Sequence, residues 1–316
     1  MAVYTLVSAE EMAPLLRRFD AGTLTSAKGI AEGVENSNFL IDTSGGTDGS
    51  RFILTLYEKR VDADDLPFFF ALLDHLAENG VPVPRAIRDR SGAQLQQVAG
   101  RPACLIEFLP GVSVTRPNPA QAHATGAALG QMHTALATFT LNRPNTMGLA
   151  GWHELAARCG DDLDGIAPGL GARVAAELDW LDHHWPRDLP MAVVHADLFP
   201  DNVLMRGDGV GGLIDFYFAC TEVRAWDVAV THASWSFDPD GMGYRAEVGD
   251  AIIAGYEAEF GLSDAERAAF AALARGACLR FLLTRAWDWL NTPADALVTR
   301  KDPLAFLRRL DHYAAT

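Results

Sequence analysis

The sequence predicts an α+β chain with two lobes, a small antiparallel β-sheet lobe with one helix followed by a larger, mostly helical lobe. Two observations support this fold class. Up to about residue 108, short apolar runs alternate with glycine- and proline-containing turns, which is typical of strands. After Pro110-Gly111, apolar residues recur at helical spacing over long segments, interrupted by one β-rich stretch, 192–216. The lobes are expected to be 1–107 and 108–316, with a hinge at 107–111.

The first lobe is expected to pair its strands through tight turns. Residues 33–42 and 51–57 flank the glycine-containing turn 45–49 and predict an antiparallel hairpin. Gly80 ends a helical pattern. In chain order, the expected elements are a candidate strand over 22–29, strands over 33–42 and 51–57, a helix over 65–79, and strands over 94–98 and 103–108.

The second lobe is expected to consist mainly of long helices. Ser263 and Glu266 have the spacing of a capping box, which marks the start of one of them. The expected helices cover 120–139, 170–184, 246–260, 263–291 and 303–314.

Composition and charge exclude several classes of partner. The chain has 26 Lys and Arg against 41 Asp and Glu, a formal net charge of −15, and such a surface repels nucleic acids and anionic membranes. No apolar run approaches the ~20 residues that a membrane helix needs, and a signal-peptide pattern is absent. The four cysteines form no C-x-x-C pair, so no thiolate metal site is expected. We expect a cytoplasmic protein that binds neither nucleic acid nor membrane.

The strongest chemical signal is a His-x-Asp-x-x-x-x-Asn pattern from His195 to Asn202, followed by Asp215 at the end of an apolar stretch. Phosphoryl transfer from ATP needs Mg²⁺ held by hard oxygen ligands, which Asn202 and Asp215 supply. It also needs a carboxylate that accepts or orients the proton of the attacking hydroxyl, and Asp197 fits that role. His195 is interpreted as a buried, loop-bracing imidazole. Either fragment alone would more often be a turn, but both in this order predict a kinase.

One further motif match lies in the wrong structural context, and three other catalytic motifs are absent from the sequence. Residues 207–212 match G-x-G-x-x-G, but an apolar strand follows the glycines where a dinucleotide site requires a helix. The sequence contains no G-x-x-x-x-G-K-[ST], H-E-x-x-H or G-x-S-x-G pattern. Walker-type, zinc-protease and serine-hydrolase sites are therefore excluded.

The catalytic motifs resemble the aminoglycoside phosphotransferase and choline kinase superfamily, which has a protein-kinase-like two-lobe fold. Segments 29–39, 52–58, 65–69 and 226–230 are similar to its homoserine kinase branch, and the similarity covers roughly residues 25–290. This resemblance implies ATP- and Mg²⁺-dependent phosphorylation of the homoserine side-chain hydroxyl to O-phosphohomoserine, a step of threonine biosynthesis.

The resemblance also implies roles for further residues. Asp227 would be a buried brace of the catalytic loop. The loop from Gly33 to Phe39 would cover the ATP phosphates, and the end of strand 103–108 would meet the adenine. The implied nucleotide-binding residues are Gly33, Asn36, Ser37, Asn38, Thr55, Glu107, Phe108 and Lys28.

The sequence departs from the wider superfamily at an ion pair. A strand Lys or Arg and a helix Glu are expected there, but Thr55 and Phe69 occupy the two places. Joint loss is physically coherent, because one partner alone would leave a buried unpaired charge. Compensation is expected from Mg²⁺, loop amides and Lys28. Of the other two lysines, Lys59 is expected in a solvated turn and Lys301 in the C-terminal tail, outside the catalytic motifs.

Homoserine is a zwitterion, so its site needs a cation for the carboxylate and an acid for the ammonium group. Arg280, Thr284, Trp287 and Asp288 stand at helical spacing and share one face. Arg280 is predicted to bind the carboxylate through its bidentate guanidinium, and Asp288 to bind the ammonium. An internal Arg–Asp pair that braces the last two helices is the alternative.

Two other functions stay open. One is a kinase of another small hydroxyl acceptor, such as choline, an aminoglycoside or another hydroxy-amino compound. The other is a nucleotide-binding pseudokinase, which only the missing ion pair supports and the intact Asp197, Asn202 and Asp215 set opposes. The protein is expected to be a monomer or a homodimer.

Overall fold

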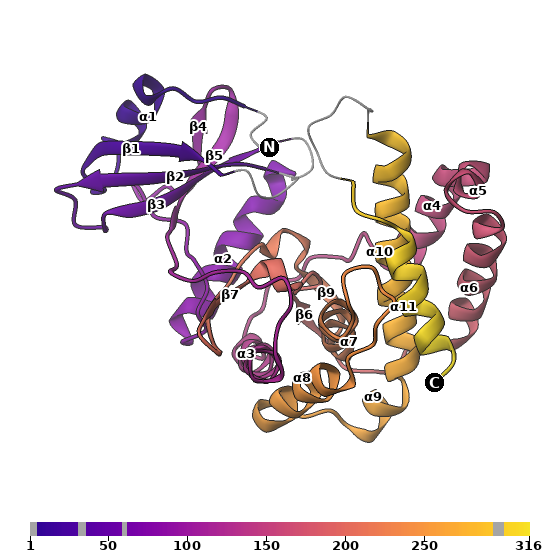
Figure 1. Cartoon of the computed structure of the whole chain (residues 1–316). Helices are drawn as coiled ribbons and strands as arrows, with labels where there is room; N and C mark the ends of the chain where they lie inside the picture. Colours follow the sequence, from indigo (N-terminus) through magenta and orange to yellow (C-terminus); the bar gives the residue numbers. More distant parts are fainter. Residues whose placement is uncertain (1–4, 31–35, 59–61, 293–299) are drawn as a thin grey trace. The chain divides into compact units, whose positions relative to one another are not determined.

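The computed structural model describes residues 5–30, 36–58, 62–292 and 300–316. The chain divides into two compact units, Met1–Pro110 and Gly111–Thr316 (Figure 1). The first is a β-sheet unit and the second is mostly helical, so the predicted α+β organisation is confirmed.

The first unit is built on a five-stranded sheet with the order β1-β2-β3-β5-β4, in which all neighbours are antiparallel. The predicted hairpin is present, because Asn36 to Asp42 of β2 pair in register with Tyr57 to Arg51 of β3. The elements are α1 (Ala9–Leu16), β1 (Thr23–Gly29), β2 (Asn36–Ser44), β3 (Arg51–Tyr57), the 3-10 turn Ala63–Asp65, α2 (Leu66–Glu78), β4 (Gln96–Val98) and β5 (Arg101–Glu107).

Helix α1 corrects the expectation of one helix in this unit. Ser8 and Glu11 form a capping box at its start, which is a readable sequence signal. Pro14 lies inside the helix, and helix propensity alone would predict no helix there. Tertiary packing decides the outcome, because Met12, Leu15 and Leu16 are buried against the apolar residues of the sheet.

The second unit contains two small two-stranded sheets, β6 with β9 and β7 with β8, among its helices. The elements are α3 (Pro119–Leu136), α4 (Leu149–Cys159), the 3-10 turn Gly160–Asp162, α5 (Leu163–Ile166), α6 (Leu170–His184), β6 (Met191–Val194), the 3-10 turn Pro200–Asn202, β7 (Val203–Arg206), β8 (Gly209–Leu213), the 3-10 turn Phe216–Phe218, β9 (Cys220–Val223), α7 (Arg224–Trp235), α8 (Ala246–Glu259), α9 (Asp264–Ala268), α10 (Phe270–Asn291) and α11 (Leu304–Ala314).

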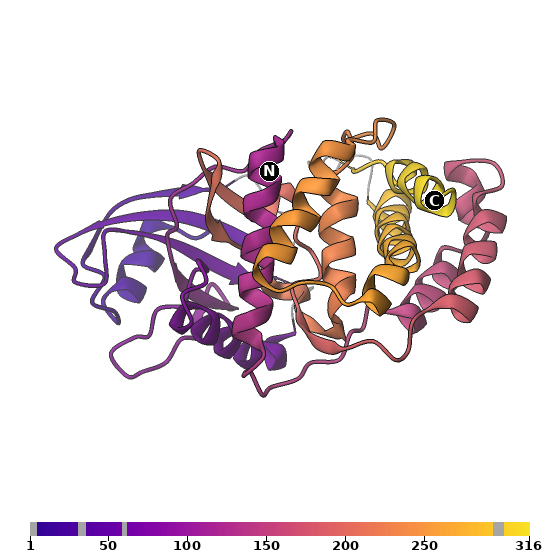
Figure 2. The same cartoon turned by 90° about the horizontal axis from the view of Figure 1, so that it is seen from below.

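Helices α3 and α8 run side by side, as the magenta and orange helices of Figure 2 show. Glycines permit this close approach. A Cβ on Gly126 of α3 would lie 2.1 Å from the carbonyl oxygen of Ile252, and one on Gly255 of α8 would lie 2.0 Å from that of His123. The α3–α8 contact is therefore made between backbones, with no room for side chains at these two positions.

The helical unit differs from the prediction at two places. The predicted helix 263–291 is two helices that meet at Ala269, and the capping box of Ser263 and Glu266 is present as predicted. Helix α7 was not predicted. Every residue from Ala225 to Trp235 is buried, so α7 lacks the polar face from which periodicity identifies a helix. Helices α4 and α5 and strand β9 were also not predicted.

Among the described residues, no helix is both long and apolar enough to cross a membrane.

Candidate active site

The His195–Asn202 motif forms the loop between β6, which ends at Val194, and β7, which begins at Val203. Two of the local residues have a left-handed backbone without being glycine: Ala196 has a φ of 65° and Asp215 a φ of 66°. Such conformations cost free energy for residues with a Cβ and are typical of functional sites that the surrounding structure holds in place. Asp197 and Asp215 are both half-buried.

Asp227 on α7 was predicted to brace this loop. It is fully buried and contacts the loop backbone. Its two carboxylate oxygens accept the backbone N–H groups of His195 at 2.7 Å and Ala196 at 2.8 Å. The Nε2 atom of His133 lies 3.2 Å from the same carboxylate. Burial raises the pKa of Asp227, but the hydrogen bond and charge of His133 and the loop amide outweigh it, so the net pKa is lowered. Asp227 is thus an anion that holds the peptide directly before Asp197.

His133 is a supporting residue that the sequence reading missed. It lies on α3 and is 2% exposed, and its Nδ1 is 2.9 Å from the hydroxyl of Tyr256 on α8. No local sequence motif identifies His133 as a supporting residue, because its partners are 94 and 123 residues away in the chain. Through His133, the α3–α8 pair is connected to Asp227 and to the catalytic loop.

His195 joins the two halves of the predicted site. The N–H of Asp197 donates to its Nδ1 at 3.2 Å, which makes Nδ1 an acceptor and leaves Nε2 to donate to the carbonyl oxygen of Ile214 at 3.0 Å. Burial lowers the pKa of His195, so the neutral tautomer is favoured. The imidazole therefore links the backbone at Asp197 to the residue that precedes Asp215.

Asn202 is oriented by the residue predicted to be the base. Its Nδ2 donates to the Asp197 carbonyl oxygen at 2.8 Å and to Asp197 Oδ2 at 3.1 Å. Its backbone oxygen accepts the N–H of Ile214 at 3.0 Å, which places Asn202 next to the segment of Asp215. Because the amide nitrogen is engaged, the side-chain oxygen is the atom left for a ligand. An amide oxygen and a carboxylate are donors that suit Mg²⁺, which completes its shell with water and phosphate oxygens.

Arg280 takes a place that the sequence did not predict. Its side chain is buried, with the residue 2% exposed, and its Nη1 donates to the carbonyl oxygen of Ala196. The guanidinium also lies 4.6 Å from the ring centre of Phe281 and 5.0 Å from that of Phe218. This burial opposes the predicted direct contact with the homoserine carboxylate, and the observed contacts are those of a residue that holds the loop. Asp288, the predicted ammonium ligand, is half-buried on the same helix.

Lys301 corrects a second expectation. Its Nζ lies 3.4 Å from Asp201 Oδ2 and 6.0 Å from the ring centre of Phe199, both in the catalytic loop. The residue is distant from the motif in sequence but adjacent to it in space. Its side chain is 56% exposed, so this ion pair contributes little stability by itself.

The predicted nucleotide-binding residues belong to the β-sheet unit. Asn36, Ser37 and Asn38 lie on β2, and the Thr55 hydroxyl on β3 donates to Asn38 Oδ1 at 2.7 Å. Thr55 is 2% exposed and Phe69, which stands in place of the superfamily glutamate, is 1% exposed. Neutral groups therefore occupy both buried places of the missing ion pair.

The remaining predicted nucleotide residues have varied surroundings. Lys28 is exposed on β1. The backbone N–H of Glu107 already donates to the carbonyl oxygen of Arg85 at 3.0 Å, and the Arg51 guanidinium lies 5.3 Å from the ring centre of Phe108. Gly33 and Lys59 lie outside the described residues. Nucleotide binding by this set stays a prediction.

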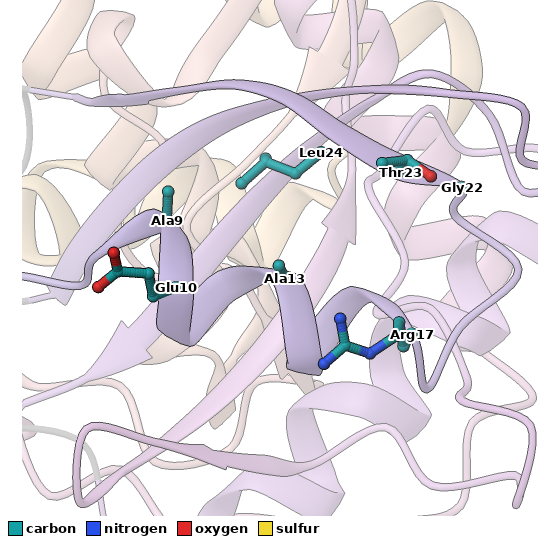
Figure 3. Close-up of a pocket in the computed structure, with 7 residues that line it drawn as sticks. All are labelled: Ala9, Glu10, Ala13, Arg17, Gly22, Thr23 and Leu24. Carbon is teal, nitrogen blue, oxygen red and sulfur yellow. The ribbon is translucent and has the colours of Figure 1, made fainter.

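A shallow pocket between α1 and β1 contains none of the predicted site residues (Figure 3). Its lining consists of Ala9, Glu10, Ala13, Arg17, Gly22, Thr23 and Leu24.

Comparison with known proteins decides the family. Residues 26–272 match the model of the phosphotransferase enzyme family. The chain is 56% identical over 315 residues to the homoserine kinase of Zymomonas mobilis, covering 99% of this chain and 97% of that protein. It is 52% identical to the homoserine kinase of Xanthobacter autotrophicus, covering 100% of this chain and 97% of that protein. The chain belongs to the homoserine kinases of the phosphotransferase enzyme family. The predicted resemblance is thereby confirmed.

Solved structures of more distant phosphotransferases share the fold of this homoserine kinase family member. An amicoumacin kinase in complex with AMP-PNP, Ca²⁺ and Ami has a TM-score of 0.70 at 18% identity, covering 97% of this chain and 94% of that chain. A choline kinase from Cryptosporidium parvum has a TM-score of 0.70 at 14% identity, covering 98% and 95%. The predicted protein-kinase-like fold is confirmed.

Proposed function

We propose that this chain transfers the γ-phosphoryl group of ATP to the side-chain hydroxyl of homoserine, giving O-phosphohomoserine and ADP. The observation that carries the proposal is the loop His195–Asn202, in which Asn202 is hydrogen-bonded to Asp197, and His195 is bonded to the carbonyl oxygen of Ile214, the residue before Asp215. The backbone of this loop is held by Asp227. The high identity to named homoserine kinases supports the acceptor. The AMP-PNP of a structural relative supports ATP as the donor.

Asp197 is the proposed base. Asn202 Nδ2 donates to its Oδ2, which orients the carboxylate. As the homoserine oxygen forms its bond to the γ-phosphorus, its proton passes to Asp197 and the bond from phosphorus to the ADP oxygen breaks. Asp197 is half-buried, so it is partly shielded from bulk water.

Asn202 and Asp215 are the proposed holders of Mg²⁺. When bound, this ion would neutralise phosphate charge during transfer. His195 keeps the two ligand segments in register through Asp197 N–H and Ile214 O. The proposed nucleotide contacts are the residues of β2, β3 and the end of β5 identified from the family resemblance, together with Lys28.

The test is ADP release with homoserine, choline and kanamycin as separate acceptors, for the wild type and Asp197→Asn. We expect turnover with homoserine and a loss of about 10²–10⁴-fold in kcat for the variant, the range of general-base contributions. Asp208→Asn is the matched control, because Asp208 is an exposed residue of the β7–β8 turn.

Each rival function has its own outcome. Turnover with choline or kanamycin but not homoserine would show that the acceptor is wrong. ATP binding without turnover of any acceptor would show a pseudokinase. Near-wild-type turnover by Asp197→Asn would remove Asp197 from the role of base.

A further inference from the structure

Arg285 lies on α10 beside the aromatic cluster that supports the catalytic loop. Its guanidinium is 4.5 Å from the ring centre of Phe306, and Phe306 is 5.9 Å from Phe199 in the loop. Its Nη1 donates to the carbonyl oxygen of Asp302 at 3.2 Å. These contacts fix the position of the guanidinium. The Phe306 ring contacts both it and Phe199, which belongs to the loop that carries Asp197.

The charge of Arg285 is not matched by a carboxylate partner. Among the residues that the structure describes, none places a carboxylate oxygen within ion-pair distance of it, and its polar contact is to a backbone oxygen. Burial and the nearby Arg309 lower the pKa of Arg285 to about 10, while Asp201, Asp302 and Asp197 act in the opposite direction. Arg285 is therefore cationic at neutral pH, partly desolvated, and within electrostatic reach of the proposed base.

A partly desolvated cation with no anion against it is costly unless a ligand supplies one. We propose that Arg285 binds the carboxylate of the acceptor amino acid and so selects hydroxy-amino acids over plain amino alcohols. This inference rests on the proposed function, because it assigns a subsite to the same acceptor. A guanidinium suits the role, since its planar fork can donate two parallel hydrogen bonds to one carboxylate.

Neighbouring residues agree with this assignment. Asp288 follows Arg285 by three residues on α10, so the two stand on one helix face and present an acid beside a cation, as a zwitterion requires. Arg280 is engaged with Ala196 and is 2% exposed, which argues against it as the carboxylate partner. Lys301 is the rival cation, but it already faces Asp201 and is largely solvated.

The experiment compares homoserine with aminopropanol, which is homoserine without its carboxylate. The kcat/KM of both acceptors is measured for the wild type, Arg285→Met, Arg285→Lys, Lys301→Met and Arg308→Met. Arg308 is the matched control, because this residue of α11 also contacts Asp302, at 3.2 Å, and its side chain is 35% exposed. If aminopropanol turns over too slowly, its inhibition constant against homoserine gives the same comparison.

We expect Arg285→Met to lower kcat/KM for homoserine by about 10–100-fold, the effect of losing charged hydrogen bonds. Its effect should fall mainly on KM, and kcat/KM for aminopropanol should stay within about twofold of wild type. Arg285→Lys should be intermediate for homoserine, and Arg308→Met should change neither acceptor.

Several results would overturn the proposal. An equal loss for both acceptors in Arg285→Met would indicate a structural role only. Unchanged kinetics in Arg285→Met, or a selective loss in Lys301→Met instead, would move the subsite elsewhere. These results leave homoserine turnover by the wild type intact, whereas its absence would contradict the proposed function and this inference together.

Discussion

Arg280 on α10 donates from Nη1 to the carbonyl oxygen of Ala196, the residue directly before Asp197. Asp227 accepts the N–H of the same residue at 2.8 Å. Ala196 is thus held from both sides, by a cation at its carbonyl and an anion at its amide, in a left-handed conformation with a φ of 65°. Two buried charges therefore hold the peptide directly before Asp197.

This arrangement predicts that Arg280→Met lowers kcat by about 10–100-fold with little change in the KM of homoserine. The variant leaves the Ala196 carbonyl without its charged donor and removes a contact worth roughly 1.5–3 kcal/mol. Steady-state kinetics over a range of homoserine concentrations provide the measurement. Ala196→Gly, added to Arg280→Met, should restore part of kcat, because glycine adopts a left-handed φ without steric cost. A change confined to KM would instead support the direct substrate contact predicted from the sequence.

Acid should destabilise the protein through His232 on α7. Burial lowers the pKa of His232 to about 4, from an ordinary value of 6.5, and its Nδ1 lies 2.5 Å from the Tyr313 hydroxyl. Between these two pH values the unfolded chain binds the proton more readily than the folded one, so stability falls as the pH falls. The expected loss is about 3 kcal/mol by pH 4, and most of it arises below pH 6.5.

Thermal unfolding from pH 4 to 8 tests this, with His232→Gln expected to flatten the acid limb of the curve. His183→Gln is the control, because His183 is exposed on α6 and its removal should leave the limb as in wild type. A wild-type slope in His232→Gln would assign the acid sensitivity to other groups.

Gly126→Ala should destabilise the protein, although alanine normally stabilises a helix interior by roughly 1 kcal/mol relative to glycine. The new Cβ would lie 2.1 Å from the carbonyl oxygen of Ile252, so α3 and α8 would have to separate. We expect a loss of about 1–3 kcal/mol in the free energy of unfolding, measured by urea denaturation.

Gly165→Ala provides the contrast, because a Cβ at Gly165 would meet no atom within 4 Å. The same substitution should be neutral or slightly stabilising there. Equal effects at both sites would mean that the α3–α8 contact relaxes without cost.

The candidate catalytic residues could be proposed from the sequence because their motif is local. His195, Asp197 and Asn202 fall within one short loop, and the strand that ends before Asp215 follows directly in the β7–β8 hairpin. Their short-range spacing was therefore enough to predict these residues and their order along the chain. The hairpin of β2 and β3 was predictable for the same reason, since a turn and two alternating strands are adjacent in sequence.

His195 and Asp227 were predicted as supports of that site, but three long-range contacts to the site were not. His133 meets Asp227 across 94 residues, Arg280 meets Ala196 across 84, and Lys301 meets Asp201 across 100. Helical spacing identifies residues that share a face, but it does not say which neighbour that face will meet.

By itself the sequence determined the fold class and the β2–β3 hairpin, and it predicted Asp197, Asn202 and Asp215 as the catalytic and metal-binding set. The tertiary structure alone decided that Arg280 holds the loop and that Arg285 is the cation left without a carboxylate partner among the described residues. Both arginines lie on α10, and nothing in their local sequence distinguishes them. The difference arises from packing. The guanidinium of Arg280 is buried and donates to the Ala196 carbonyl oxygen, whereas that of Arg285 lies over the Phe306 ring.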